Sequence, residues 1–134
     1  MKLPDEVRAV WSRASTAGGA YDIFEIEAVG PALVLANFGG LIAHGALWIH
    51  YIDNEAALAT MVKGSSSVMS GEVMTSFTHS LIAKMGLWCW FDRVASADNP
   101  VDQLSRGKMD GPWELLPIEF PAQLMRGLQS YLGM

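Results

Sequence analysis

Three acidic residues, Glu27, Asp53 and Asp102, lie far apart in the chain but at positions that a fold can bring together. Asp53 directly follows an apolar run, and the other two flank it at a distance in sequence. Carboxylate oxygens are ligands that Mg²⁺ prefers, together with water and substrate phosphate. Carboxylates held close together also repel one another and favour proton uptake unless cations neutralise them. The spacings therefore permit a divalent-cation site, provided that the intervening elements converge.

The hydrophobic pattern predicts the elements that would position these residues. Residues 23–38 are apolar at helical spacing and stop at a glycine pair, which indicates a mostly buried helix in which Pro31 causes a bend or marks a restart. The runs 46–52 and 87–94 are short and rich in β-branched and aromatic residues, which is typical of strands. Further helices are expected at residues 5–13, 55–63, 70–85, 101–106 and 122–132.

Two strands joined by a helical crossover must run parallel if they share a sheet. The fold class predicted is therefore α/β, with a small parallel strand pair at about 46–52 and 87–94 and flanking helices. In open α/β sheets, ligands bind beyond the carboxyl ends of the strands, and Asp53 follows such an end.

Composition narrows the class of protein. A chain of 134 residues with 51% hydrophobic content has the apolar surface to form one folded domain. Its formal net charge of −5 argues against non-specific nucleic-acid binding through phosphates, so such a role would need a metal or a partner. The single cysteine, Cys89, lies in an aromatic run and is expected to be a buried thiol.

The expected location is intracellular, either cytoplasmic or nuclear, because acidic residues and Pro4 stand where a secretory signal would have its apolar core. Residues 28–52 contain no Asp, Glu, Lys or Arg and are long enough to span a bilayer. A small membrane subunit spanning 28–52 is therefore kept as the minority alternative, although Pro31 and the pair Gly39-Gly40 interrupt the segment.

Three blocks of sequence occur in an order that resembles a known family. They are Ile23-x-x-Ile26-Glu27, then Ile52-Asp53-Asn54-Glu55-Ala56-Ala57 followed by Val62-Lys63-Gly64-Ser65-Ser66, then Arg93-Val94-x-Ser96-x-x-Asn99-Pro100-x-Asp102-x-x-Ser105-Arg106-Gly107. Together they resemble the ribonuclease H domain of retrotransposon reverse transcriptase polyproteins. The resemblance divides the chain into an N-terminal helix and loop (1–20), a ribonuclease H-like core (21–110) and a tail with a helix (111–134).

The resemblance implies a chemistry and a set of site residues. In that family, four carboxylates hold two Mg²⁺ ions, and Glu27, Asp53 and Asp102 match the second, third and fourth. Two such ions activate the attacking water and stabilise the leaving oxygen, here in hydrolysis of the RNA strand of RNA/DNA hybrids. By their places in the matching blocks, four residues are expected to contact the substrate: Lys63, Ser65, Arg93 and Arg106.

The chain also departs from the family. The family's first three strands, and the first catalytic Asp that they carry, have no counterpart before Glu27. The strand at 46–52 would then have an unpaired edge, which proteins normally cover. We therefore expect a protein partner or self-association over that edge, or a chain that is a fragment of a larger polyprotein. A domain that kept the fold as a non-catalytic interaction subunit is the alternative to an endonuclease.

Ordinary structural roles compete with these functional interpretations. Glu27 can complement a helix dipole, Asp53-Asn54 can cap the next helix, and Asp102 can be a solvated residue in a short helix. The histidines lack metal-ligand spacing and are interpreted as loop, strand and helix residues in the order His44, His50 and His79. The aromatic cluster Trp88, Trp90 and Phe91 is assigned to the core or to an interface, because a base-stacking platform would need interleaved positive charge.

Overall fold

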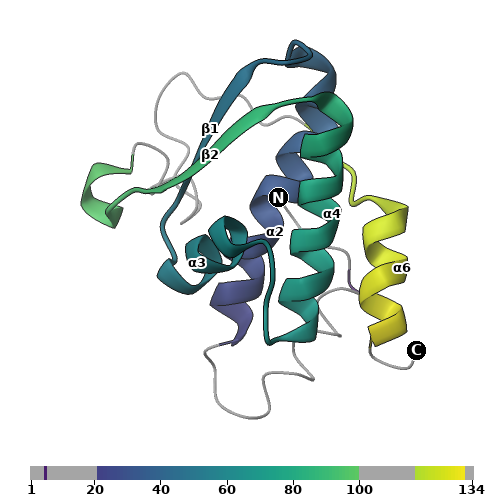
Figure 1. Cartoon of the computed structure of the whole chain (residues 1–134). Coiled ribbons are helices and arrows are strands. Elements are labelled where there is room, and N and C mark those ends of the chain that lie inside the picture. Colours follow the sequence, from purple (N-terminus) through teal and green to yellow (C-terminus); the bar gives the residue numbers. More distant parts are fainter. Residues whose placement is uncertain (1–4, 6–20, 100–116, 132–134) are drawn as a thin grey trace.

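The computed structural model describes Asp5 and residues 21–99 and 117–131. In this part the protein is a mixed α/β fold in which helices pack against a two-stranded sheet (Figure 1). The elements are α2 (Tyr21–Phe38), the short helix η2 (Gly39–Leu41), β1 (Leu47–Ile52), α3 (Glu55–Lys63), α4 (Met69–Met85), β2 (Trp88–Arg93), η3 (Ser96–Asp98) and α6 (Ala122–Tyr131). The helices expected at 6–13 and 101–106 lie outside the described residues.

Helix α2 is the central element of the core. It lies against α4 and α3, and it buries Ala28, Val29, Ala32 and Leu33. Pro31 lies inside the continuous helix α2, so the helix does not restart there. Because proline has no backbone N–H, it cannot donate the usual helical hydrogen bond to the carbonyl four residues earlier, which belongs to Glu27.

The two strands are parallel, which confirms the crossover predicted from the sequence. The register pairs Leu47 with Trp88 and Ile52 with Arg93. Helices α3 and α4 form the connection, and α4 ends at Gly86, whose φ of +62° is the left-handed conformation that glycine adopts readily. The carboxyl ends of both strands therefore lie at the same end of the sheet.

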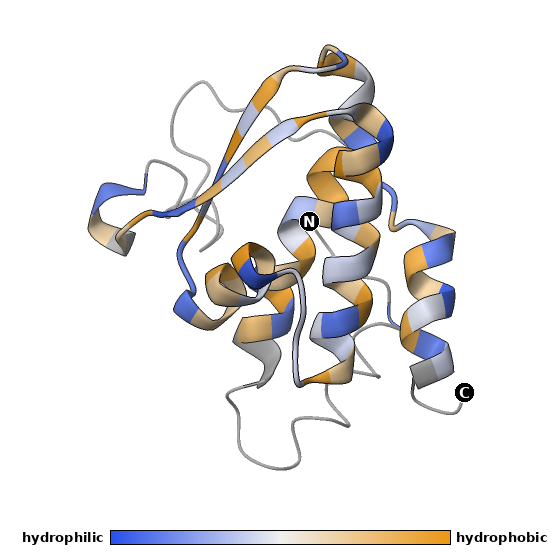
Figure 2. Ribbon diagram, in the orientation of Figure 1, coloured by the Kyte–Doolittle hydropathy of each residue, from blue (hydrophilic) through white to orange (hydrophobic). Residues whose placement is uncertain are grey.

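The two faces of the sheet differ in burial. Residues at alternate positions, among them Trp48, His50, Ile52 and Phe91, are buried or half-buried on the side of the helices. The residues between them are exposed, and we call this group the open face: Leu47, Ile49, Tyr51, Trp88 and Trp90. Figure 2 shows apolar stretches along both strands. Of the aromatic cluster expected in the core or at an interface, only Phe91 packs into the core.

Helix α6 completes the core although it follows the core in sequence. Leu124 and Leu128 are 1% exposed and belong to the same cluster as Val29 of α2. The segment before α6 is fixed by two hydrogen bonds, because the Asn37 side chain donates to the Glu119 carbonyl and accepts from the Glu119 N–H, at 2.9 and 2.7 Å. The tail therefore packs as part of the same unit.

One helical stretch, Phe24–Leu41, is long and apolar enough to cross a membrane. Of this stretch, 44% is buried inside the protein, and buried core helices of soluble proteins meet the same criterion. The segment 28–52 considered as a span is not one helix, because it contains the end of α2, then η2 and the strand β1. Length and composition therefore leave the location of the protein open.

Burial of His50 predicts a pH-dependent stability. The His50 ring packs against Trp48 and Phe91, and burial lowers its pKa from 6.5 to about 4. The unfolded chain then takes up a proton at a higher pH than the folded chain, so stability falls as pH drops from 6.5 towards 4. We expect a loss of at most about 3 kcal/mol across this window, from 1.36 kcal/mol per pKa unit.

The measurement is urea denaturation followed by circular dichroism between pH 4 and 8. His50→Phe should remove this part of the pH dependence while keeping the aromatic packing, whereas the control His44→Gln, at an exposed turn position, should retain it. An unchanged pH profile in His50→Phe would contradict the assignment.

Candidate carboxylate site

Asp53 stands between two elements that fix its backbone. It follows Ile52, the last residue of β1, which is 2% exposed and anchored in the core. It precedes Asn54, whose side-chain oxygen accepts a hydrogen bond from the N–H of Ala57 at 2.9 Å and so caps α3. Of the two residues for which the sequence allowed a capping role, Asn54 is the one whose side chain makes the cap. Asp53 is half-buried at the carboxyl end of the sheet.

Glu27 lies near Asp53 although 25 residues separate them. Its neighbours in α2, Ala28 and Val29, are completely buried, while Glu27 itself is half-buried. Burial raises the pKa of the Glu27 carboxyl above 4.5, and the negative charge of Asp53 raises it further. The structure thus brings together two of the three acidic residues selected from the sequence, and Asp102 lies outside the described residues.

An ion pair lies at the same end of the sheet as Asp53. Arg93 Nη1 lies 2.5 Å from Glu55 Oε1. Arg93 is opposite Ile52 in the register, and Glu55 begins α3 two residues after Asp53. The sequence interpretation selected Arg93 as a substrate contact but did not include Glu55. The parallel pairing of the two strands was predicted. The contact between Arg93 and Glu55 depends on the register of that pairing, which no sequence pattern showed.

The other expected substrate contacts are farther from the carboxylates. Lys63 is the last residue of α3, and Ser65 follows the helix stop at Gly64. A helix rises 1.5 Å per residue, so the nine residues of α3 place Lys63 about 12 Å from Glu55 along the helix axis. Arg106 lies outside the described residues. Within the described chain, Arg93 is the substrate candidate nearest to the strand ends.

The donor set at this site suits a metal ion only in part. Within residues 21–99 and 117–131, no group of three or more His, Cys, Asp or Glu side chains is arranged to hold one. Glu27 and Asp53 supply two carboxylates, which are the hard oxygen donors that suit Mg²⁺. The raised pKa of Glu27 also fits, because a cation would offset the repulsion that causes part of the shift. The residues present are therefore compatible with Mg²⁺ but form only part of a coordination shell.

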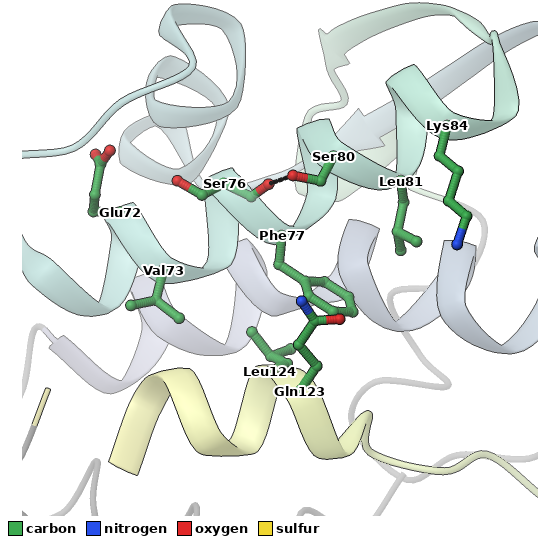
Figure 3. A pocket seen from close by; sticks show the side chains of 9 residues that line it. All are labelled: Glu72, Val73, Ser76, Phe77, Ser80, Leu81, Lys84, Gln123 and Leu124. Carbon is green, nitrogen blue, oxygen red and sulfur yellow. Dashed lines mark hydrogen bonds between the residues drawn. The ribbon is translucent and has the colours of Figure 1, made fainter. Parts of the chain in front are cut away.

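Two cavities lie away from the carboxylates. One of about 530 Å³ lies between α4 and α6, with Phe77, Leu81 and Leu124 in its lining and Glu72 and Lys84 farther apart along α4 (Figure 3). The other, of about 440 Å³, lies between α3, α4 and β2 and includes Cys89, whose thiol pKa is raised to about 11 by burial. The cysteine is therefore a protonated, half-buried thiol at neutral pH.

The raised pKa of Glu27, caused by burial and by the Asp53 charge, predicts the behaviour of Glu27→Gln. An acid whose pKa is raised by folding is most stabilising at low pH, and this contribution is lost as pH rises from 4.5 through the higher folded pKa. Removing the charge should therefore raise the free energy of unfolding at pH 7 without divalent cations, by less than about 1 kcal/mol because the site is partly solvated.

Thermal denaturation with and without Mg²⁺ tests this expectation. Mg²⁺ should raise the melting temperature of the unmodified protein more than that of Glu27→Gln, and the exposed control Glu119→Gln should respond like the unmodified protein. A Glu27→Gln protein that is less stable at pH 7 would instead indicate that this carboxylate makes a stabilising hydrogen bond.

Comparison of the chain with protein-family models, with curated protein sequences and with solved structures finds no significant match to any of the three.

Proposed function

We propose that this chain derives from a ribonuclease H-like domain of a retroelement and acts on the RNA strand of RNA/DNA hybrids by metal-dependent hydrolysis. The observation that carries the proposal is the approach of Glu27 and Asp53 at the carboxyl end of a parallel strand. The resemblance selects these two carboxylates from separate blocks of sequence, and each block would have little weight alone. Their proximity in space supports a common role.

Further support comes from the order of the elements. Asp53 follows the last residue of β1, and Arg93 is the last residue of the neighbouring strand β2. Glu27 lies on α2, close enough to Asp53 for the two charges to interact. Asp102 follows β2 by nine residues, so the chain length allows it to return to this edge.

The roles of the residues follow from their chemistry. Glu27, Asp53 and Asp102 would hold two Mg²⁺ ions, which activate the attacking water and stabilise the leaving oxygen when bound. Burial and the neighbouring Asp53 charge raise the pKa of Glu27, and a bound cation would oppose this shift because it favours the carboxylate. Asp53 is held by the β1 end and by the capped start of α3, so its backbone needs little rearrangement.

A cleavage assay with a labelled RNA/DNA hybrid and Mg²⁺ tests the proposed activity. Asp53→Asn should lower the rate of cleavage by at least about a hundredfold, because an amide is a weak Mg²⁺ ligand and removes one charge from the site. Asp98→Asn, an exposed change near the end of β2, is the matched control and should keep the activity. Cleavage that is equally fast in Asp53→Asn would refute the assignment of the site.

A second candidate function is a non-catalytic interaction subunit, which the open face favours. Trp88 and Trp90 are 74% and 62% exposed, and Leu47 is 69% exposed. Parallel sheets are normally covered on both faces, so uncovered apolar side chains on one face are typical of an interaction surface. In the described part of the chain, β1 pairs with β2 alone, so the other edge of β1 has no neighbouring strand there. A protein partner or self-association over residues 46–52 would cover this edge.

Sedimentation velocity over a range of protein concentrations tests the interaction subunit. We expect concentration-dependent self-association, which Ile49→Lys on the open face should abolish by placing a charge in the apolar contact. Met69→Lys, at an exposed apolar position at the start of α4, is the matched control and should still associate. A stable monomer at all concentrations would exclude self-association through this surface.

A further inference from the structure

The ion pair between Arg93 and Glu55 occupies a distinctive place in the fold. Both side chains are accessible, with exposures of 54% and 72%, so solvent and solutes can reach them. Arg93 ends β2 opposite the residue before Asp53, and Glu55 opens α3 just after Asp53. The pair therefore stands at the same end of the sheet as Glu27 and Asp53.

Among the described residues, Arg93 is the positively charged side chain at this end of the sheet. The other described Lys and Arg residues lie elsewhere: Lys63 at the end of α3, Lys84 near the end of α4, and Arg126 in α6. The end of α4 leads into the start of β2, at the opposite end of the sheet. Of the side chains that the structure describes, Arg93 is therefore the positively charged one that a polyanion would encounter on approaching Glu27 and Asp53.

An arginine in this position is suited to a phosphodiester. The guanidinium is planar and charged at any working pH, and its N–H groups match two oxygens of a phosphate. An exposed ion pair with a carboxylate contributes only about 0.2–1 kcal/mol, so a phosphate can displace Glu55 from Arg93. The N–H of Arg93 donates to the Asp92 side chain at 2.8 Å, which leaves the guanidinium out of that contact.

Resting on the proposed function, we propose that Glu55 is a positioning residue that holds Arg93 beside the carboxylates and yields it to a phosphate of the substrate backbone. Glu55 competes with the substrate for the same guanidinium. Its removal strengthens substrate binding, although it is a residue of the site, and its effect disappears when Arg93 is absent. A residue that only supports the fold would not show this dependence.

Glu55 also has a structural role that the experiment must separate. It lies in the first turn of α3, where a negative charge complements the helix dipole by a few tenths of a kcal/mol. Loss of that contribution lowers stability equally whether or not Arg93 is present. Substrate affinity measured in both backgrounds therefore distinguishes competition from helix stabilisation.

The test measures binding of a fluorescein-labelled RNA/DNA hybrid by anisotropy in Mg²⁺, with cleavage kinetics of the same hybrid. Glu55→Gln should tighten binding about two- to fivefold, the range that an exposed ion pair allows. Arg93→Gln should weaken it about tenfold and reduce the salt dependence by about one phosphate contact. The double variant should bind like Arg93→Gln alone, and in cleavage Glu55→Gln should lower KM.

Asp98→Asn is the matched control, because it also removes one exposed negative charge but is not paired with Arg93. If Glu55→Gln tightens binding no more than Asp98→Asn, or by the same factor with and without Arg93, the competition is refuted while cleavage still supports the nuclease. Tighter binding in Glu55→Gln without cleavage by any variant would support the competition and refute the nuclease. Absence of hybrid binding in every variant would overturn both.

Discussion

The arrangement at this end of the sheet depends on holding two like charges, the carboxylates of Glu27 and Asp53, near each other. Glu27 and Asp53 would separate if their backbones were free, because a half-buried carboxylate gains by moving away from a second one. Each is held by its neighbour in sequence: Ala28, beside Glu27, is completely buried, and Ile52, beside Asp53, is 2% exposed. Moving the carboxylates apart would withdraw these apolar anchors from the core. Packing therefore maintains an electrostatic arrangement that is unfavourable by itself.

The parallel topology also determines which other residues lie at this end of the sheet. Because β1 and β2 are parallel, their last residues meet at one edge, and the chain leaves that edge into α3 on one side and η3 on the other. Arg93 and Glu55 come together for this reason, without being close in sequence. The described helices cover one face, so the same topology that brings Asp53, Glu55 and Arg93 to one end of the sheet also leaves the open face exposed.

Much of this arrangement can be predicted from the sequence, for physical reasons. The helix ends at Gly64 and Gly86 are strong signals because both residues adopt positive φ, and the predicted boundaries of α3 and α4 agree with the structure to within about one residue. The parallel pairing follows from the length of the crossover. These features depend on local propensity and chain connectivity, which a single sequence contains.

Other features depend on information that the sequence does not contain. The exposure of Trp88 and Trp90 was not predictable, because apolar residues occupy both alternating positions of β2 and its two charged residues, Asp92 and Arg93, fall one on each face. The contact between Arg93 and Glu55 depends on register, and the choice of Asn54 over Asp53 as the cap depends on local geometry. Asp102 and Arg106 lie outside the described residues, so their assignment is still a prediction.

The place of α6 in the core affects how the protein must be made. Leu124 and Leu128 pack with residues of α2 that are synthesised almost a hundred positions earlier, and the contact between Asn37 and Glu119 joins the same two regions. While the ribosome is still translating the middle of the chain, the surface of α2 and α4 that these leucines cover is open to water and to other nascent chains. The core can therefore be completed only after α6 has left the ribosome, and chaperones that shield apolar helices would act in the interval.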